Sequence, residues 1–129
     1  MTVTQPGRTT AAPVMPVRVD QSLAWRAPIL AGRLGDGFAV SVGRPGTAGI
    51  ALLPARAPEQ LAAVRAVAPD LGIVVIADWA TRRDAAAIAE TFEAGADAYF
   101  DGHSLTELIA LLKTLARRVP AVAHVEGLR

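Results

Sequence analysis

Three aspartates follow apolar runs, at positions where charged side chains could meet. Asp20 follows V-M-P-V-R-V, Asp78 follows I-V-V-I-A, and Asp101 follows A-D-A-Y-F. If these runs are parallel strands, their carboxyl ends share one edge, and carboxylates there could hold a hard cation. The plainer interpretation is that Asp starts the loops after buried strands and caps their turns. We favour the second interpretation and predict no metal site.

Other side chains that could do chemistry also lack partners. His103 and His124 have no histidine or cysteine nearby at metal-ligand spacing. The G-R-P-G run at 43–46 lacks the G-x-x-x-x-G-K pattern of a phosphate-binding loop, and we interpret it as a turn. No Ser-His-Asp order or paired carboxylate indicates catalysis. We therefore predict that the protein is not an enzyme and carries no cofactor.

The elements that would position these residues are clearest in the stretch 71–118. The run L-G-I-V-V-I-A is typical of a parallel strand buried on both faces. A helix Thr81–Ala94, a strand within A-G-A-D-A-Y-F-D and a helix Ser104–Arg118 are predicted to follow. Thr81 with Asp84, and Ser104 with Glu107, have the spacing of capping boxes.

The first half of the chain predicts three more strands and two more helices. Pro28 lies inside the first helix, where it would clash with the preceding turn, so that helix is expected to kink or to begin again there. Five residues, Gly43–Thr47, are too few for a normal crossover helix between parallel strands. The predicted elements are a strand Val14–Asp20, a helix Ser22–Leu34 capped by Ser22, strands Phe38–Val42 and Ile50–Leu53, and a helix from Pro58.

Composition bounds the class of protein. A chain of 129 residues fits one domain and buries roughly two-thirds of its unfolded surface. A net charge of +1 gives no argument for a nucleic-acid groove, and the absence of cysteine excludes disulfides. No apolar run approaches the ~18 residues of a membrane span, and no secretion signal is evident. We expect a cytoplasmic protein with a disordered tail (1–13), one domain (14–118) and a linker (119–129).

Three motifs resemble the receiver domain of response regulators. They are P-D-L-G-I-V-V-I at 69–76, E-A-G-A-D-A-Y-F at 93–100 and S-L-T-E-L at 104–108. The resemblance is to OmpR/PhoB-like receivers of two-component signal transduction. It implies an α/β, flavodoxin-like (CheY-like) doubly wound fold with a five-stranded parallel sheet of order 2-1-3-4-5. The short connection at 43–47 then implies a reduced or missing second helix.

The resemblance also implies a phosphorylation pocket, and that pocket is degenerate. The phosphoacceptor aspartate of receivers falls at Pro54, and their acidic pair falls at Asp20 and Gln21. Their Ser/Thr falls at Ala77 and their lysine at Gly102. Phosphoryl transfer needs a nucleophile, a metal and a cation to position and neutralise the phosphoryl group. The sequence therefore predicts an atypical pseudo-receiver that works independently of phosphorylation.

In OmpR/PhoB-like receivers a twofold dimer forms through the last two helices and the strand between them. By resemblance, the pair Asp97–Lys113 keeps its charges, whereas another acid–arginine pair has become apolar at both positions, which avoids a stranded charge. The alternative is that Ile88 and Phe92, four apart on one helix, face the core. The predicted dimer interface comprises Ile88, Ala89, Phe92, Asp97, Ala98, Glu107, Ala110, Leu111 and Lys113.

The predicted function is a regulatory and dimerisation module of a transcription regulator. Its partner is a second copy, and DNA is contacted only through an absent effector domain, because H-V-E-G-L-R at 124–129 resembles the start of a winged-helix domain. The alternative is a small-molecule sensor. In that case a ligand occupies the vacated pocket around Asp20, Pro54, Ala77 and Gly102, at the switch point of the sheet.

Overall fold

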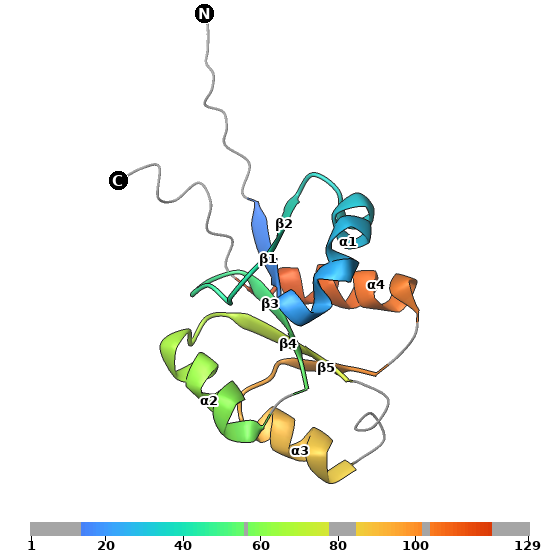
Figure 1. Cartoon of the computed structure of the whole chain (residues 1–129). Coiled ribbons are helices and arrows are strands. Elements are labelled where there is room, and N and C mark those ends of the chain that lie inside the picture. The colour runs from blue at the N-terminus through green and yellow to red at the C-terminus, as the bar shows by residue number, and fades with distance from the viewer. Residues whose placement is uncertain (1–13, 56, 78–84, 102–103, 120–129) are drawn as a thin grey trace, which may run out of the picture.

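Five parallel strands form one sheet in the order β2-β1-β3-β4-β5 (Figure 1). The computed structural model describes residues 14–55, 57–77, 85–101 and 104–119. The predicted strand order is confirmed. The strands are β1 (Met15–Val19), β2 (Phe38–Val42), β3 (Ile50–Pro54), β4 (Gly72–Ile76) and β5 (Ala98–Phe100), and the α-helices are α1 (Ala27–Leu34), α2 (Pro58–Val67), α3 (Ala85–Glu93) and α4 (Leu105–Ala116).

Helices cover both faces of the sheet, α1 and α4 on one side and α2 and α3 on the other (Figure 1). The central strands explain this arrangement, because every residue of β4 and all of β3 except Pro54 are buried. Alternate residues of these strands enter two separate cores, as the two-residue period of a strand requires. Leu52 and Val74 pack with α1 and α4, whereas Leu53 and Val75 pack with Leu61 of α2.

The segment after β1 differs from the prediction in how it starts. A 3-10 helix, η2 (Gln21–Arg26), comes first, and α1 follows from Ala27 with Pro28 in its first turn. The helix thus begins again near Pro28, where the missing N–H is harmless. The predicted cap was wrong: Asp20 caps η2, and Ser22 donates to it. On α4 the predicted cap is confirmed, since Ser104 accepts a bond from the Glu107 amide, whereas the proposed cap at Thr81 lies outside the described residues.

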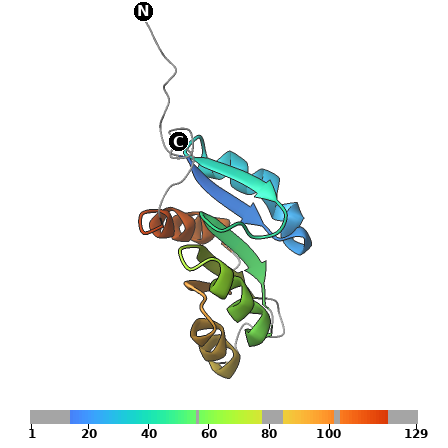
Figure 2. The ribbon, with the colours of Figure 1, turned by 90° about the vertical axis from the view of Figure 1, so that its left-hand side faces the viewer.

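No helix lies between β2 and β3, so the prediction of a missing second helix is confirmed. Residues 43–49 cross over β1 as an irregular loop (Figure 2). The loop can be short because it returns only a small distance along β1. β2 ends beside Val19 of β1, and β3 starts beside Val17, two residues earlier on the same strand. Gly49 is needed at its end: its φ is +87°, and a Cβ there would lie 2.5 Å from the Pro16 carbonyl oxygen.

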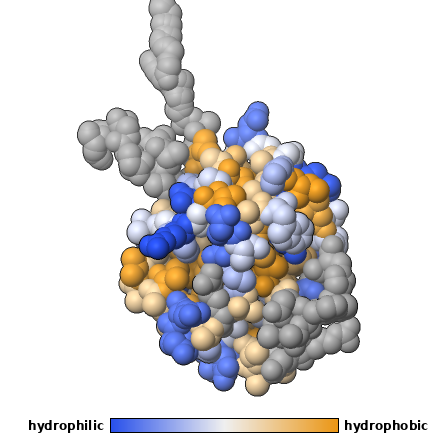
Figure 3. Space-filling view, in the orientation of Figure 1, coloured by the Kyte–Doolittle hydropathy of each residue, from blue (hydrophilic) through white to orange (hydrophobic). Residues whose placement is uncertain are grey.

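The missing helix leaves part of the sheet uncovered. Ala39 and Ser41 of β2 point to the side of the sheet opposite α1 and are exposed. Beside them, the loop and the C-terminal half of α2 enclose a shallow groove of about 390 Å³. Val67 lines that groove and is 73% exposed. Figure 3 shows apolar surface on the side where α2 lies.

Candidate functional site

The carboxyl edge of the sheet is where the degenerate phosphorylation pocket was predicted. Pro54 ends β3, the central strand, in register with Ile76 of β4. The Asp20 amide donates to the Leu52 carbonyl, and the Ala77 amide donates to the Phe100 carbonyl. These bonds hold Asp20, Pro54 and Ala77 at the ends of adjacent strands. The structure therefore brings together the described members of the predicted pocket.

Asp20 serves the local backbone at this edge. Its Oδ2 accepts one hydrogen bond from the Ser22 amide at 3.0 Å and another from the Ser22 hydroxyl at 2.6 Å. Gln21, the second position of the predicted acidic pair, is the exposed first residue of η2. The plainer interpretation of Asp20, a capping aspartate after a buried strand, is confirmed.

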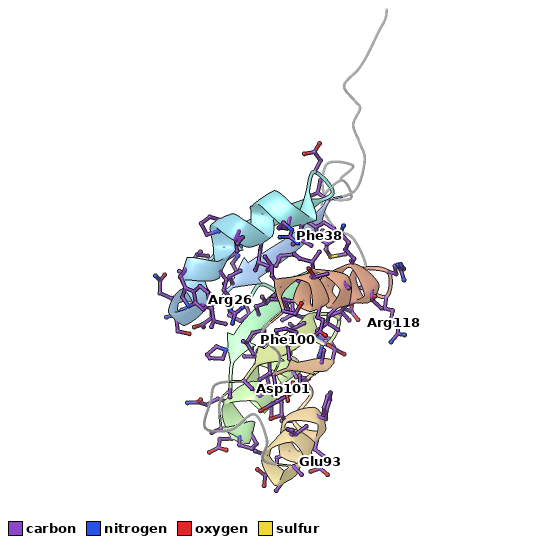
Figure 4. All side chains as sticks on the ribbon, turned by 90° about the vertical axis from the view of Figure 1, so that its right-hand side faces the viewer. Arg26, Phe38, Glu93, Phe100, Asp101 and Arg118 are labelled. Carbon is purple, nitrogen blue, oxygen red and sulfur yellow. The ribbon has the colours of Figure 1, made fainter. Side chains whose placement is uncertain are left out.

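The described residues offer no cation site at this edge. Asp101 is exposed just past β5, following the buried Phe100 (Figure 4). No group of three His, Asp or Glu side chains within the described ranges could hold a metal ion. Gly102 of the predicted pocket, Asp78, His103 and His124 lie outside the described residues. Proline at 54 supplies neither a nucleophilic oxygen nor a metal ligand in its side chain.

Arg26, at the end of η2, has a shifted pKa and stacks on the neighbouring Trp25. Its guanidinium carbon lies 4.4 Å from the centroid of the Trp25 ring, a cation–π distance. Burial lowers the pKa of the Arg26 guanidinium from its ordinary value. Its Nε is buried and has no hydrogen-bond partner among the described residues. Trp25 itself is 69% exposed, so the stacked pair presents an apolar ring to solvent.

The predicted dimer interface maps onto α3, β5 and α4, at the β5 edge of the sheet. Phe92 is 45% exposed, and Ile88 is half-buried. Ala98 and Leu111 pack against the core on the α4 side. The apolar patch is therefore narrower than the sequence indicated, with Phe92 as its large exposed member. The remaining predicted residues, Ala89, Asp97, Glu107, Ala110 and Lys113, are exposed.

Asp97 has a partner within its own chain that the sequence did not reveal. Its Oδ2 accepts a hydrogen bond from Arg65 Nη2 at 2.7 Å and one from the Ile73 amide at 2.8 Å. The Asp97 side chain is 40% exposed, so solvent screens this ion pair. The pair of Asp97 with Lys113 across a dimer stays a prediction, but one oxygen of Asp97 is already engaged.

Arg65, on α2, links three parts of the fold through one guanidinium. Its Nη1 donates to the carbonyls of Ala68, Pro69 and Leu71, at the turn that leads into β4. Its Nε and Nη2 donate to the Gly95 carbonyl, just before β5. The one sequence signal for this role is that Arg65 lies four residues after the buried Leu61, on the inner side of its helix.

Two further hollows lie away from the carboxyl edge. One, of about 470 Å³, surrounds the starts of β4 and β5 beneath Arg65, Asp97 and Arg118. The other, of about 410 Å³, lies between α2 and α3 and carries Glu59, Glu90 and Glu93. Neither includes a residue of the predicted pocket. Among the described residues, no helix is long and apolar enough to cross a membrane.

Comparison with solved structures gives the fold a context. No family model matches the chain, and a search of the curated proteins finds no significant match. A response regulator from Thermotoga maritima superposes with a TM-score of 0.66 at 16% identity, covering 81% of this chain and 98% of that one. DrrB, a Thermotoga maritima OmpR/PhoB homologue, gives a TM-score of 0.63 at 16% identity, covering 81% of this chain and 54% of that one.

A third similar structure is described as a pilus protein rather than as a response regulator. A putative pilus assembly-related protein from Burkholderia pseudomallei gives a TM-score of 0.67 at 14% identity, covering 87% of this chain and 96% of that one. At these identities the likeness concerns the fold. Receiver domains have this strand order with helices on both faces. The chain therefore has the CheY-like fold of response-regulator receiver domains.

Proposed function

We propose that this protein is a receiver-like regulatory module that works without aspartate phosphorylation and acts as a homodimer. The observation that carries the proposal is the place of Pro54, at the carboxyl end of the central strand β3. Parallel α/β sheets bind ligands and carry out chemistry at that edge, beside the strand order's switch point. A receiver that took a phosphoryl group there would need a side-chain oxygen, and proline has none.

The first experiment tests phosphorylation directly. The purified chain is incubated with acetyl phosphate and Mg²⁺, and intact-protein mass spectrometry then looks for a phosphoryl adduct. We expect none, because the nucleophile is absent at Pro54 and Asp20 is bonded to Ser22. A receiver with an intact phosphorylation site, treated in parallel, must gain the adduct. An adduct on this chain at an aspartate would overturn the proposal.

Self-association is proposed through the α3, β5 and α4 face. Phe92 supplies its exposed apolar contact, and the exposed Glu107 and Lys113 lie on the neighbouring helix α4. An apolar centre with charged groups around it is the usual composition of a protein interface. In OmpR/PhoB-like receivers, which this sequence resembles, the corresponding face forms the twofold dimer.

The structure decides which variants test this face. Leu111 packs against the core, so a charge there would unfold the protein as well as weaken a dimer. Phe92→Asp combined with Ala110→Glu places charges at two exposed positions of α3 and α4 instead. Val67→Asp is the matched control, because Val67 is an even more exposed apolar residue on a different helix.

Sedimentation equilibrium over a concentration series measures the result. We expect the double variant to weaken association through this face at least tenfold while Val67→Asp leaves it unchanged. Mg²⁺ and acetyl phosphate should change neither. Equal association of the double variant and the parent chain would remove this face from the proposal. Association that required the phosphoryl donor would contradict phosphorylation independence.

We further propose that transcription is the regulated process and that DNA contact belongs to a separate effector domain. The support is the OmpR/PhoB-like sequence motifs and the fact that this chain spans about half the length of DrrB. The small-molecule alternative remains a second prediction, in which a ligand occupies the vacated pocket at the carboxyl edge of the sheet. A ligand that raised the melting temperature and lost this effect in Ala77→Trp would favour the sensor.

A further inference from the structure

The outer edge of β2 is a free strand edge. β2 stands first in the sheet order and pairs only with β1 among the described residues. The Met15 amide donates to the Gly37 carbonyl and the Gly43 amide donates to the Val19 carbonyl. Since bonding residues alternate along a parallel strand, the residues between these two that bond to β1 are 39 and 41. The backbone groups of Phe38, Val40 and Val42 therefore point outward.

This edge lacks the features that normally prevent strands from pairing with other chains. β2 reads F-A-V-S-V, with no charge, proline or bulge over five residues. Edge strands are usually kept from association by such features or by being very short. The other edge shows the contrast: β5 has three residues and lies between Asp97 and Asp101. The β2 edge is thus the more favourable of the two for backbone pairing.

The free groups of β2 are complementary to themselves under a twofold axis. The Phe38 amide already donates to the Gly35 carbonyl at 3.2 Å, so it is not needed by a second strand. An antiparallel copy centred on Val40 would exchange both backbone bonds between the two Val40 residues. Val42 of each chain would donate to the Phe38 carbonyl of the other. This register uses the outward groups and leaves the occupied Phe38 amide alone.

The same register also pairs the side chains. It places Val40 opposite Val40 and Phe38 opposite Val42, which is 39% exposed in the single chain. Apolar cross-strand pairs of this kind stabilise antiparallel strands. Just beyond the strand, the exposed Asp36 of one chain falls opposite the exposed Arg44 of the other, on both sides of the axis. Charge complementarity therefore favours a second copy over an unrelated peptide as the occupant.

We infer that two copies of this chain pair antiparallel through their β2 edges, joining two five-stranded sheets into one continuous sheet. This contact is separate from the proposed dimer face, because β2 and β5 form opposite edges of the sheet (Figure 1). It also differs in chemistry. The β2 contact is made by backbone hydrogen bonds, whereas the α3, β5 and α4 face relies on side chains.

Amide hydrogen exchange, resolved by residue with NMR, tests the inference in the full chain. In a lone molecule the Val40 and Val42 amides face solvent and should exchange at nearly the free rate. With pairing, their protection should rise at least tenfold from micromolar to millimolar protein. Protection of Leu52 and Val74, in the buried strands, should not depend on concentration. Free exchange at Val40 and Val42 in concentrated protein would overturn the inference.

Two pairs of variants make the test specific. Val42→Pro removes an outward donor without touching the ladder to β1 and should abolish the concentration dependence, whereas Val42→Thr keeps the donor and should preserve it. Arg44→Glu sets like charges together and should weaken pairing roughly tenfold. The double variant Asp36→Arg/Arg44→Glu should restore it. Failure of the restoration would remove the assigned register.

The outcome is independent of the proposed function. The variant Phe92→Asp/Ala110→Glu should leave the concentration-dependent protection at Val40 and Val42 intact. If the α3, β5 and α4 dimer does not exist, this protection is still expected. If the protection is absent in both proteins, the β2 inference fails and the proposed dimer is unaffected.

Discussion

At the residue scale, the single side chain of Arg65 satisfies several backbone carbonyls in two turns. Its guanidinium donates to a carbonyl just before β4, to a carbonyl just before β5 and to Asp97. These carbonyls lie in turns, where no strand partner is present to satisfy them. Hydrogen bonds from a charged donor contribute about 1.5–3 kcal/mol each, and less where solvent reaches them. The starts of β4 and β5 therefore depend on a residue of α2.

Replacing Arg65 should lower the free energy of unfolding. We expect Arg65→Leu to cost about 2 kcal/mol, because the carbonyls lose their charged donor and Asp97 loses its ion pair, and Arg65→Lys to recover part of it. Urea denaturation measures the change. Arg33→Ala, an exposed arginine on α1, is the control and should stay within about 0.5 kcal/mol of the parent. An equally small effect of Arg65→Leu would show that water satisfies these carbonyls.

The contacts between individual side chains were the least predictable part of the site. Asp97 was assigned to Lys113 by resemblance, but its observed partner Arg65 lies 32 residues earlier, on another element. No local spacing encodes such a contact. Asp20 was different: its capping role was predicted from the buried strand before it, and only the assignment of Ser22 as the helix cap was wrong.

At the element scale, the loop 43–49 replaces a helix with a close backbone contact. The short connection between the predicted strands was enough to predict a reduced or missing helix, because a crossover needs a dozen residues or more. The sequence did not indicate how the loop closes. Closure depends on Gly49 passing over Pro16, a contact between segments far apart in the chain.

A substitution at Gly49 should therefore be far worse than one nearby. Gly49→Ala forces a Cβ against the Pro16 backbone at a positive φ, and we expect a loss of roughly 2–4 kcal/mol in unfolding free energy. Gly46→Ala is the matched control, since its nearest neighbour would be 3.9 Å away. Thermal and urea unfolding compare the two. Similar stabilities would mean that the loop can move away from β1.

The start of α4 gives a smaller but well-defined effect. Ser104 accepts from the Glu107 amide at 3.2 Å and satisfies one of the open donors of the helix. Ser104→Ala should cost about 1 kcal/mol. Thr106→Ala, an exposed position in the first turn, serves as the control. The cap could be predicted because Ser followed three residues later by Glu is a capping signal. This signal depends on neighbouring residues in the chain and not on the tertiary structure.

At the scale of the whole molecule, the two edges of the sheet decide how copies can assemble. The strand order followed from the resemblance, and the apolar run at 71–77 predicted that its strand is buried on both faces. The exposure of each edge did not follow, because it depends on which helices are absent and on where Asp97 and Asp101 lie around β5. The exposure of a sheet edge is therefore a property of the folded molecule and cannot be read from the sequence of one strand.

Two twofold contacts on opposite edges should produce open chains of molecules. We expect the parent protein to pass beyond the dimer as concentration rises. Val42→Pro should stop at the dimer, Phe92→Asp/Ala110→Glu should stop at a different dimer, and their combination should be monomeric. Sedimentation velocity resolves these species. A parent chain limited to dimers at millimolar concentration would contradict the simultaneous use of both contacts.

The uncovered face of β1 and β2 has a thermal consequence. Ala39 and Ser41 remain in water, so unfolding exposes less new apolar surface than in a sheet covered on both sides throughout. Exposure of apolar surface dominates the heat-capacity change of unfolding, about 12–15 cal/mol/K per residue in ordinary domains. Calorimetry of this domain should give a lower value. Its stability would then vary less with temperature than the stability of a domain whose sheet is covered on both faces.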